Sequence, residues 1–136
     1  MVLRVADGAA RLLHAQGGGS ENESPVHQYW KDHYCRLYAG QGYRVTWEAP
    51  RGRGRTDVLA ERASESVAIE IETGKSDAVH NVRQDLLAGF GRVLVVATNE
   101  MAFRQIERQL AKAGLVLPGR VALVLRDDPG QSVGSA

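Results

Sequence analysis

The chain has 136 residues, of which 43% are hydrophobic and 24% charged, enough for one globular domain with its own core. The formal net charge is only +1, so any contact with nucleic acid must come from local clusters of basic side chains. The single cysteine, Cys35, excludes an internal disulfide, and no apolar run approaches the roughly 18 residues that a membrane span needs. We therefore expect a protein of the cytoplasm with no membrane partner.

The chain begins with a segment that differs from the rest. Residues 1–16 predict a short N-terminal helix or the tail of an upstream segment. Residues 17–25 are rich in Gly, Ser and Glu, which indicates a flexible linker. The domain is expected over residues 26–126, and the polar tail 127–136 is expected to be disordered.

A helix and a meander of strands form the first half of the expected domain. The helix is predicted over residues 26–39, with Ser24 as its N-cap and Pro25 in its first turn. Three strands follow, and a Gly/Arg loop at residues 49–55 separates the first from the second. Short connections of this kind favour antiparallel pairing. The expected strand ranges are 43–48, 56–61 and 66–73.

Helices and strands alternate in the second half. A helix is predicted over residues 77–89, a strand that is buried on both faces over 93–97, an amphipathic helix over 100–113 and a last strand over 121–125. Strands that are joined through helices favour parallel pairing. The sequence therefore predicts an α/β three-layer sandwich, in which helices flank a mixed central sheet of about five strands.

The third expected strand carries two carboxylates on one face. Strand side chains alternate, so Glu70 and Glu72 point the same way. Neighbouring acids repel each other and are costly to bury, and a bound divalent cation would remove this conflict. If the second and third strands pair, Asp57 joins both glutamates at one end of the sheet. The alternative is the solvated face of an edge strand.

Asp57 and the later run Ile69-Glu70-Ile71-Glu72-Thr73-Gly74-Lys75 resemble the PD-(D/E)xK nuclease superfamily, which has the restriction-endonuclease-like fold. The resemblance covers about residues 24–125 and extends to nuclease-like domains that are associated with DNA-processing ATPases. It implies a DNA endonuclease that hydrolyses phosphodiester bonds with Mg²⁺ or Mn²⁺. It also implies an ATPase or DNA-binding domain upstream, and it allows a homodimer when both strands must be cut.

The resemblance assigns catalytic roles to four residues, with one departure from the usual pattern. Asp57, Glu70 and Glu72 are the implied metal ligands, but Glu72 stands where the superfamily usually has a lysine that orients the water. Some restriction enzymes of this fold have a second Glu there. Lys75 is either the missing positive charge or an ordinary turn lysine. The departure keeps open a second function, a catalytically inactive module for DNA binding or protein interaction.

Basic and polar residues near these carboxylates complete the expected site. Arg51, Arg53 and Arg55 alternate with small residues, so the backbone can approach a phosphate chain while arginine binds it. Lys75 and Arg83 extend this predicted nucleic-acid-binding surface. A solubilising loop is the alternative.

Three further residues are accessory candidates. His27 and Gln28 lie on the first domain helix, and Gln84 lies on the helix after the acidic strand. Related nucleases place polar residues at both positions. The alternative for each of the three is an ordinary place on a helix surface.

Overall fold

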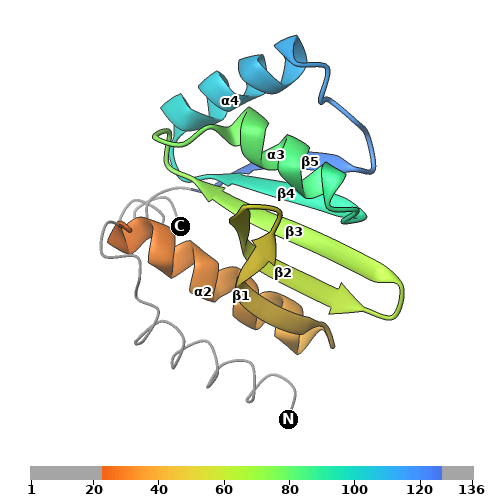
Figure 1. The fold of residues 1–136 in the computed structure, drawn as a ribbon. Coiled ribbons are helices and arrows are strands. Elements are labelled where there is room, and N and C mark those ends of the chain that lie inside the picture. The colour runs from red at the N-terminus through yellow and green to blue at the C-terminus, as the bar shows by residue number, and fades with distance from the viewer. Residues whose placement is uncertain (1–22, 127–136) are drawn as a thin grey trace.

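The chain folds around a five-stranded sheet of order β1-β2-β3-β4-β5 (Figure 1). The computed structural model describes residues 23–126, so the predictions for residues 1–16, for 17–22 and for the tail 127–136 lie outside the described residues. The described elements are α2 (Pro25–Gly40), β1 (Arg44–Arg51), β2 (Gly54–Arg62), β3 (Glu65–Glu72), α3 (Ala78–Leu87), β4 (Arg92–Ala97), α4 (Glu100–Lys112) and β5 (Val121–Leu125).

The sheet is mixed, as predicted. β1, β2 and β3 pair antiparallel, whereas β4 pairs parallel to β3 and β5 parallel to β4. The parallel pairs are those whose strands are joined through α3 and α4, in agreement with the crossover rule. Helix α2 covers one face of the sheet, while α3 and α4 cover the other (Figure 1). The α/β three-layer sandwich is thereby confirmed.

Two hydrophobic clusters fill the spaces between the layers. The α2 side holds Trp30, Tyr34, Trp47 and Ile69, and the α3/α4 side holds Ala68, Val82, Val95, Ile106 and Leu110. β3 contributes alternate residues to the two sides, because its side chains alternate across the sheet. No helix within residues 23–126 is long and apolar enough to cross a membrane.

The start of α2 departs from the expected linker. Ser24 caps the helix, since its hydroxyl accepts a hydrogen bond from the His27 N–H at 3.1 Å, and Pro25 occupies the first turn. The cap was predicted, but the linker was expected to run to residue 25. Ser24 and Pro25 therefore belong to the helix and its cap rather than to the linker.

The β1–β2 hairpin corrects a second prediction. The strands extend to Arg51 and Gly54, so Gly52 and Arg53 form a tight turn in place of the loop expected over residues 49–55. β1 is an edge strand and therefore tolerates Pro50. Glu48 has a φ of 47°, and the register passes over it from Trp47↔Val58 to Ala49↔Thr56. Beyond this distortion the hairpin extends toward α3 (Figure 1).

Candidate functional site

An open pocket of about 430 Å³ lies at the carboxyl end of β3, and we call it the acidic pocket. It is bounded by the start of α2, the distorted part of β1 and β2, and the turn after β3. The structure thus brings together three residues that the sequence singled out, Asp57, His27 and Lys75. The complete lining is Glu23, Ser24, His27, Glu48, Asp57, Thr73 and Lys75.

Asp57 is held in place by the backbone of β3. The β2–β3 ladder ends at Val58↔Ile69, and beyond it the Ile71 N–H donates to Asp57 Oδ2 at 2.7 Å. The Asp57 carboxylate therefore accepts the hydrogen bond from β3 at the point where the β2–β3 backbone ladder has ended. The Asp57 side chain is 22% exposed, so it remains accessible from the pocket.

His27 lies between two carboxylates. Its Nε2 is 3.4 Å from Asp57 Oδ2, and its Nδ1 contacts Glu23 Oε2. Burial lowers the pKa of His27, but hydrogen bonds to Asp57 and Glu23 outweigh burial and raise this pKa to about 9. The imidazole is therefore a cation at neutral pH, and it joins α2 to β2.

This arrangement predicts a loss of stability at alkaline pH. The pKa of His27 is 6.5 in the unfolded reference and about 9 in the fold, so its contribution is complete below 6.5 and is lost as the pH rises through 9. We expect the free energy of unfolding, measured by urea titration, to fall over this interval. His27→Gln should flatten the dependence, and an unchanged slope in that variant would disprove the assignment.

Lys31 and Glu23 form an ion pair next to His27. Lys31 is only 1% exposed, and its Nζ donates to Glu23 Oε2 and Glu48 Oε2, both at 2.9 Å. Burial lowers the pKa of Lys31, but these hydrogen bonds raise it further, so the amine stays charged. Glu23 Oε1 is buried and has no hydrogen-bond partner among the described residues.

The sequence interpretation missed Glu23, because that residue was assigned to the linker. One signal was available. Glu23, His27 and Lys31 are spaced by four residues, which is the spacing of neighbours on one helix face.

Glu72 lies at the end of β3 and is only 1% exposed. Ser76 Oγ donates to its Oε1 at 2.5 Å, and Asn81 Nδ2 donates to its Oε2 at 3.1 Å. Burial raises the pKa of Glu72 more than these two hydrogen bonds lower it. Glu72 therefore ties the turn that carries Lys75 to the first part of α3.

Glu70 belongs to a separate buried cluster with Arg51 and Asp85. Arg51 Nη1 donates to Glu70 Oε2 at 2.9 Å and to Asp85 Oδ1 at 3.0 Å, and Thr56 Oγ1 donates to Glu70 Oε2 at 2.8 Å. Glu70 is 2% exposed and Asp85 0%. Burial, followed by the nearby carboxylates Asp85 and Asp57, raises the pKa of Glu70 far above its usual range. Glu70 therefore retains its proton at neutral pH, and the Arg51 charge faces Asp85.

The structure contradicts the predicted role of Arg51 as a DNA contact. Its side chain is 5% exposed because the hairpin bends toward α3, and its guanidinium is directed at buried carboxylates. Arg53 and Arg83 are exposed, and neither has a hydrogen-bond or ion-pair partner among residues 23–126. Arg55 is exposed but pairs with Glu48 at 3.0 Å.

The accessory candidates lie in two different places. Gln28 and Gln84 are both half-buried. Gln84 lies beside the hairpin turn, since a Cβ added at Gly52 would be 3.4 Å from Gln84 Oε1. The pocket lining includes neither glutamine, whereas it includes His27.

The predicted set of three metal ligands does not assemble within residues 23–126. No group of three or more Asp, Glu, His or Cys residues in this part of the chain is placed to hold a metal ion. Glu70 faces Arg51, and both oxygens of Glu72 already accept hydrogen bonds. Asp57 and Glu23 line the same pocket, and Glu23 Oε1 is buried without a hydrogen-bond partner among the described residues. Mg²⁺ typically takes one or two protein carboxylates together with substrate phosphates.

No family model matches the chain, and no curated protein matches it. A crystal structure described as a protein of unknown function, AF1548, is similar with a TM-score of 0.48 and 18% identity. The similarity covers 71% of this chain and 56% of that chain, so the chain spans little more than half of that protein.

Proposed function

We propose that the domain is a metal-dependent DNA endonuclease of the restriction-endonuclease-like fold and that the acidic pocket is its site. One observation carries the proposal: Asp57 on β2, just before the β2–β3 ladder begins, and Lys75 just after β3 line the same pocket as Glu23. A carboxylate pair beside a free amine suits a divalent cation and a phosphate group together. The motif resemblance, with Asp57 before the acidic strand, supports the same function.

Asp57 and Glu23 are the residues we assign to Mg²⁺ or Mn²⁺. A bound ion would polarise the scissile phosphodiester and lower the pKa of an attacking water. His27 and Lys31 hold the two carboxylates through the contacts described above, so both act as positioning residues. Fixed carboxylates lose little freedom when a cation binds, and the ion would compete with protonated His27 for Asp57 and Glu23.

Lys75 is the residue we assign to the phosphate. It is exposed and has no hydrogen-bond or ion-pair partner among the described residues. Its positive charge would replace the motif lysine, whose place Glu72 occupies. Glu72 would act as a positioning residue, because its bonds to Ser76 and Asn81 fix the turn that presents Lys75.

The proposed partner is DNA, which Arg53 and Arg83 would contact through backbone phosphates. These contacts carry no sequence information, so we expect little sequence preference and a strong dependence on salt. An upstream ATPase or DNA-binding domain would deliver the substrate, and a homodimer would allow both strands to be cut. The cytoplasm is the proposed compartment, and Cys35 is buried and forms no disulfide.

The test is cleavage by the purified chain. Supercoiled plasmid, single-stranded DNA and branched DNA are incubated with Mg²⁺, with Mn²⁺ or with a chelator. We expect cleavage of at least one substrate with metal and none with the chelator. Absence of cleavage on all three substrates with either metal would contradict the proposal.

A second candidate is an inactive module of the same fold that binds DNA or a protein. The hydrogen bond from Arg51 to Glu70 favours this alternative, because the guanidinium lies beside Glu70, where the motif resemblance implies a metal. The same assay separates the two functions. An inactive DNA-binding module would shift the mobility of DNA in a gel without cutting it under any metal condition.

A further inference from the structure

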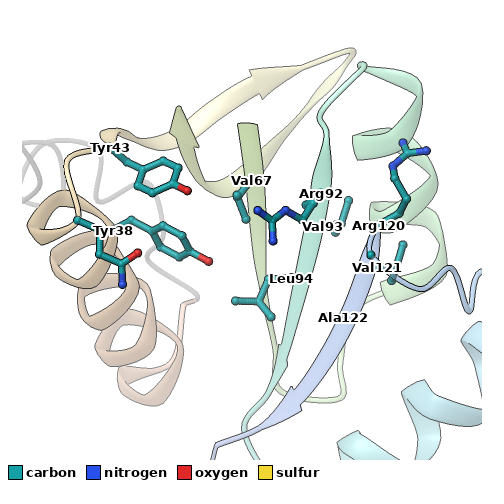
Figure 2. A pocket seen from close by; sticks show the side chains of 11 residues that line it. Tyr38, Tyr43, Val67, Arg92, Val93, Leu94, Arg120, Val121 and Ala122 are labelled. Atoms are coloured by element: carbon teal, nitrogen blue, oxygen red, sulfur yellow. The ribbon is translucent and has the colours of Figure 1, made fainter. Parts of the chain in front are cut away.

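A second pocket, of about 340 Å³, lies between the end of α2 and the first residues of β4 and β5 (Figure 2). We call it the tyrosine pocket. Arg92 begins β4, whereas the acidic pocket adjoins the last residues of β3, which runs parallel to β4. The two pockets therefore lie at opposite ends of the sheet, and the proposed nuclease chemistry uses no residue of this one. Its principal lining residues are Tyr38, Tyr43, Val67, Arg92, Leu94 and Ala122.

Strand side chains provide apolar surface in this pocket. Val67 on β3, Leu94 on β4 and Ala122 on β5 belong to adjacent strands, and Leu94 is directly paired with Ala122. Helix α2 packs chiefly on β1, β2 and β3, so this end of β4 and β5 is less covered on the α2 side. These neighbouring side chains form an apolar surface on which the flat face of a ligand ring can lie.

Two tyrosines form one wall. The rings of Tyr38 and Tyr43 pack edge to face, with centroids 5.1 Å apart and an interplanar angle of 88°. The Tyr43 hydroxyl is occupied, because it donates to Glu65 at 3.0 Å and accepts from Arg62 at 3.2 Å. The Tyr38 hydroxyl has no hydrogen-bond partner within residues 23–126, so it can donate to a ligand.

Arg92 supplies a positive charge opposite this wall. Its guanidinium has no hydrogen-bond or ion-pair partner among the described residues, and Figure 2 shows it on the side toward which both tyrosine hydroxyls point. Burial raises the pKa of Tyr38 and the Arg92 charge opposes that rise, so the two groups lie within electrostatic range. The lining includes no aspartate or glutamate; Glu65, which accepts from the Tyr43 hydroxyl beside the pocket, is within electrostatic range of Arg92 but forms no ion pair with it.

We propose that the tyrosine pocket binds a nucleoside 5′-monophosphate. A guanidinium binds two phosphate oxygens at once through its planar pair of donors, and the Tyr38 hydroxyl would donate to a third oxygen. The base would lie on the apolar surface, and the side-chain amide of Gln41 at the rim would bond to its edge. The volume falls within the range of pockets that enclose small ligands. A free nucleotide and the 5′-phosphorylated end of a strand both present this chemistry.

Calorimetric titration of the full chain with AMP tests the proposal, with adenosine and inorganic phosphate as separate ligands. We expect AMP to bind more tightly than either fragment. Arg92→Gln should weaken AMP binding by about tenfold or more, because a hydrogen-bonded charge is lost. Tyr38→Phe should weaken it less. The matched control is Arg108→Gln, which removes an exposed arginine on α4 and should leave the Kd unchanged.

Several results would overturn the proposal. These results are a failure of AMP to bind, binding of adenosine or of inorganic phosphate that is as tight as that of AMP, and an unchanged Kd for AMP in an Arg92→Gln protein whose circular dichroism spectrum is native. A 5′-phosphorylated dinucleotide that binds more tightly than AMP would assign the site to strand ends, and weaker binding would assign it to free nucleotides. Asp57→Asn should not alter the Kd for AMP, so this test is independent of the nuclease assay.

Discussion

Replacing Arg51 with methionine should lower the free energy of unfolding by about 3–5 kcal/mol, because removing one partner of a buried ion pair leaves an uncompensated charge. Arg51 Nη1 donates to both Glu70 and Asp85, and neither carboxyl group reaches solvent. Methionine keeps most of the side-chain volume, so the loss comes from charge and hydrogen bonds rather than from a cavity. Urea unfolding monitored by tryptophan fluorescence measures the change.

The control for this prediction is the neighbouring turn residue. Arg53→Met alters an exposed side chain that has no hydrogen-bond partner among the described residues, so its effect should be within about 0.5 kcal/mol. Adding Asp85→Asn to Arg51→Met should recover part of the stability, because the charge that was left unpaired is removed. An Arg51→Met protein as stable as the native one would show that the guanidinium does not hold the buried cluster.

Asp57→Asn should reduce DNA cleavage at least about a hundredfold, since a bound metal ion contributes several kcal/mol to the stabilisation of charge in the transition state. Asparagine has nearly the same shape, and its amide oxygen can still accept the hydrogen bond from Ile71 N–H. The fold should therefore persist while the metal ligand is weakened. The measurement is the initial rate of plasmid nicking with Mn²⁺.

The matched control for this variant is Glu107→Gln. It removes one exposed carboxylate on α4 and should leave the nicking rate unchanged. Glu107→Gln should melt at the native temperature, whereas Asp57→Asn should stay folded but melt lower, because it loses the charge that faces His27. An Asp57→Asn protein that nicks plasmid at the native rate would remove Asp57 from the site.

Local patterns in the sequence predicted most of the secondary structure, apart from the β1–β2 turn. Val67, Ile69 and Ile71 alternate with Ala68 and Glu70, and this alternation predicted the two faces of β3. It could be read from the sequence because the side chains of a strand alternate from one residue to the next. The continuous apolar run of β4 likewise predicted a buried strand, and the sheet has this strand next to its centre. Helical connections then predicted the parallel half of the sheet.

The detailed environment of the acidic residues depended on long-range contacts and was not predictable. The distortion at Glu48 directs the β1–β2 hairpin toward α3, and this places Arg51 against a residue 34 positions later in the chain, Asp85. The sequence around Arg51, rich in glycine and arginine, predicted an exposed loop instead. Asp85 is itself fully buried, although it lies on a helix with polar neighbours in the sequence. Whether such a charged side chain is buried depends on its partners far away in the sequence. The spacing of residues along the chain does not reveal those partners.

The division of the acidic residues between two sites is the main change to the expected chemistry. The motif resemblance implies one set of ligands, Asp57, Glu70 and Glu72. In the structure Asp57 lies beside His27 and Glu23, while Glu70 bonds to Arg51 and Thr56. We therefore assign the proposed metal to the acidic pocket and assign Glu70 a structural role.

Calorimetric titration with Mn²⁺ tests this assignment most directly, with the native chain, Asp57→Asn and Glu70→Gln compared under identical conditions. Glutamine closely resembles the protonated Glu70 side chain, and Arg51 keeps Asp85 as a partner, so Glu70→Gln should fold normally. We predict that the native chain and Glu70→Gln bind Mn²⁺ with similar affinity and that Asp57→Asn loses the binding. Loss of binding in Glu70→Gln with retention in Asp57→Asn would contradict the assignment.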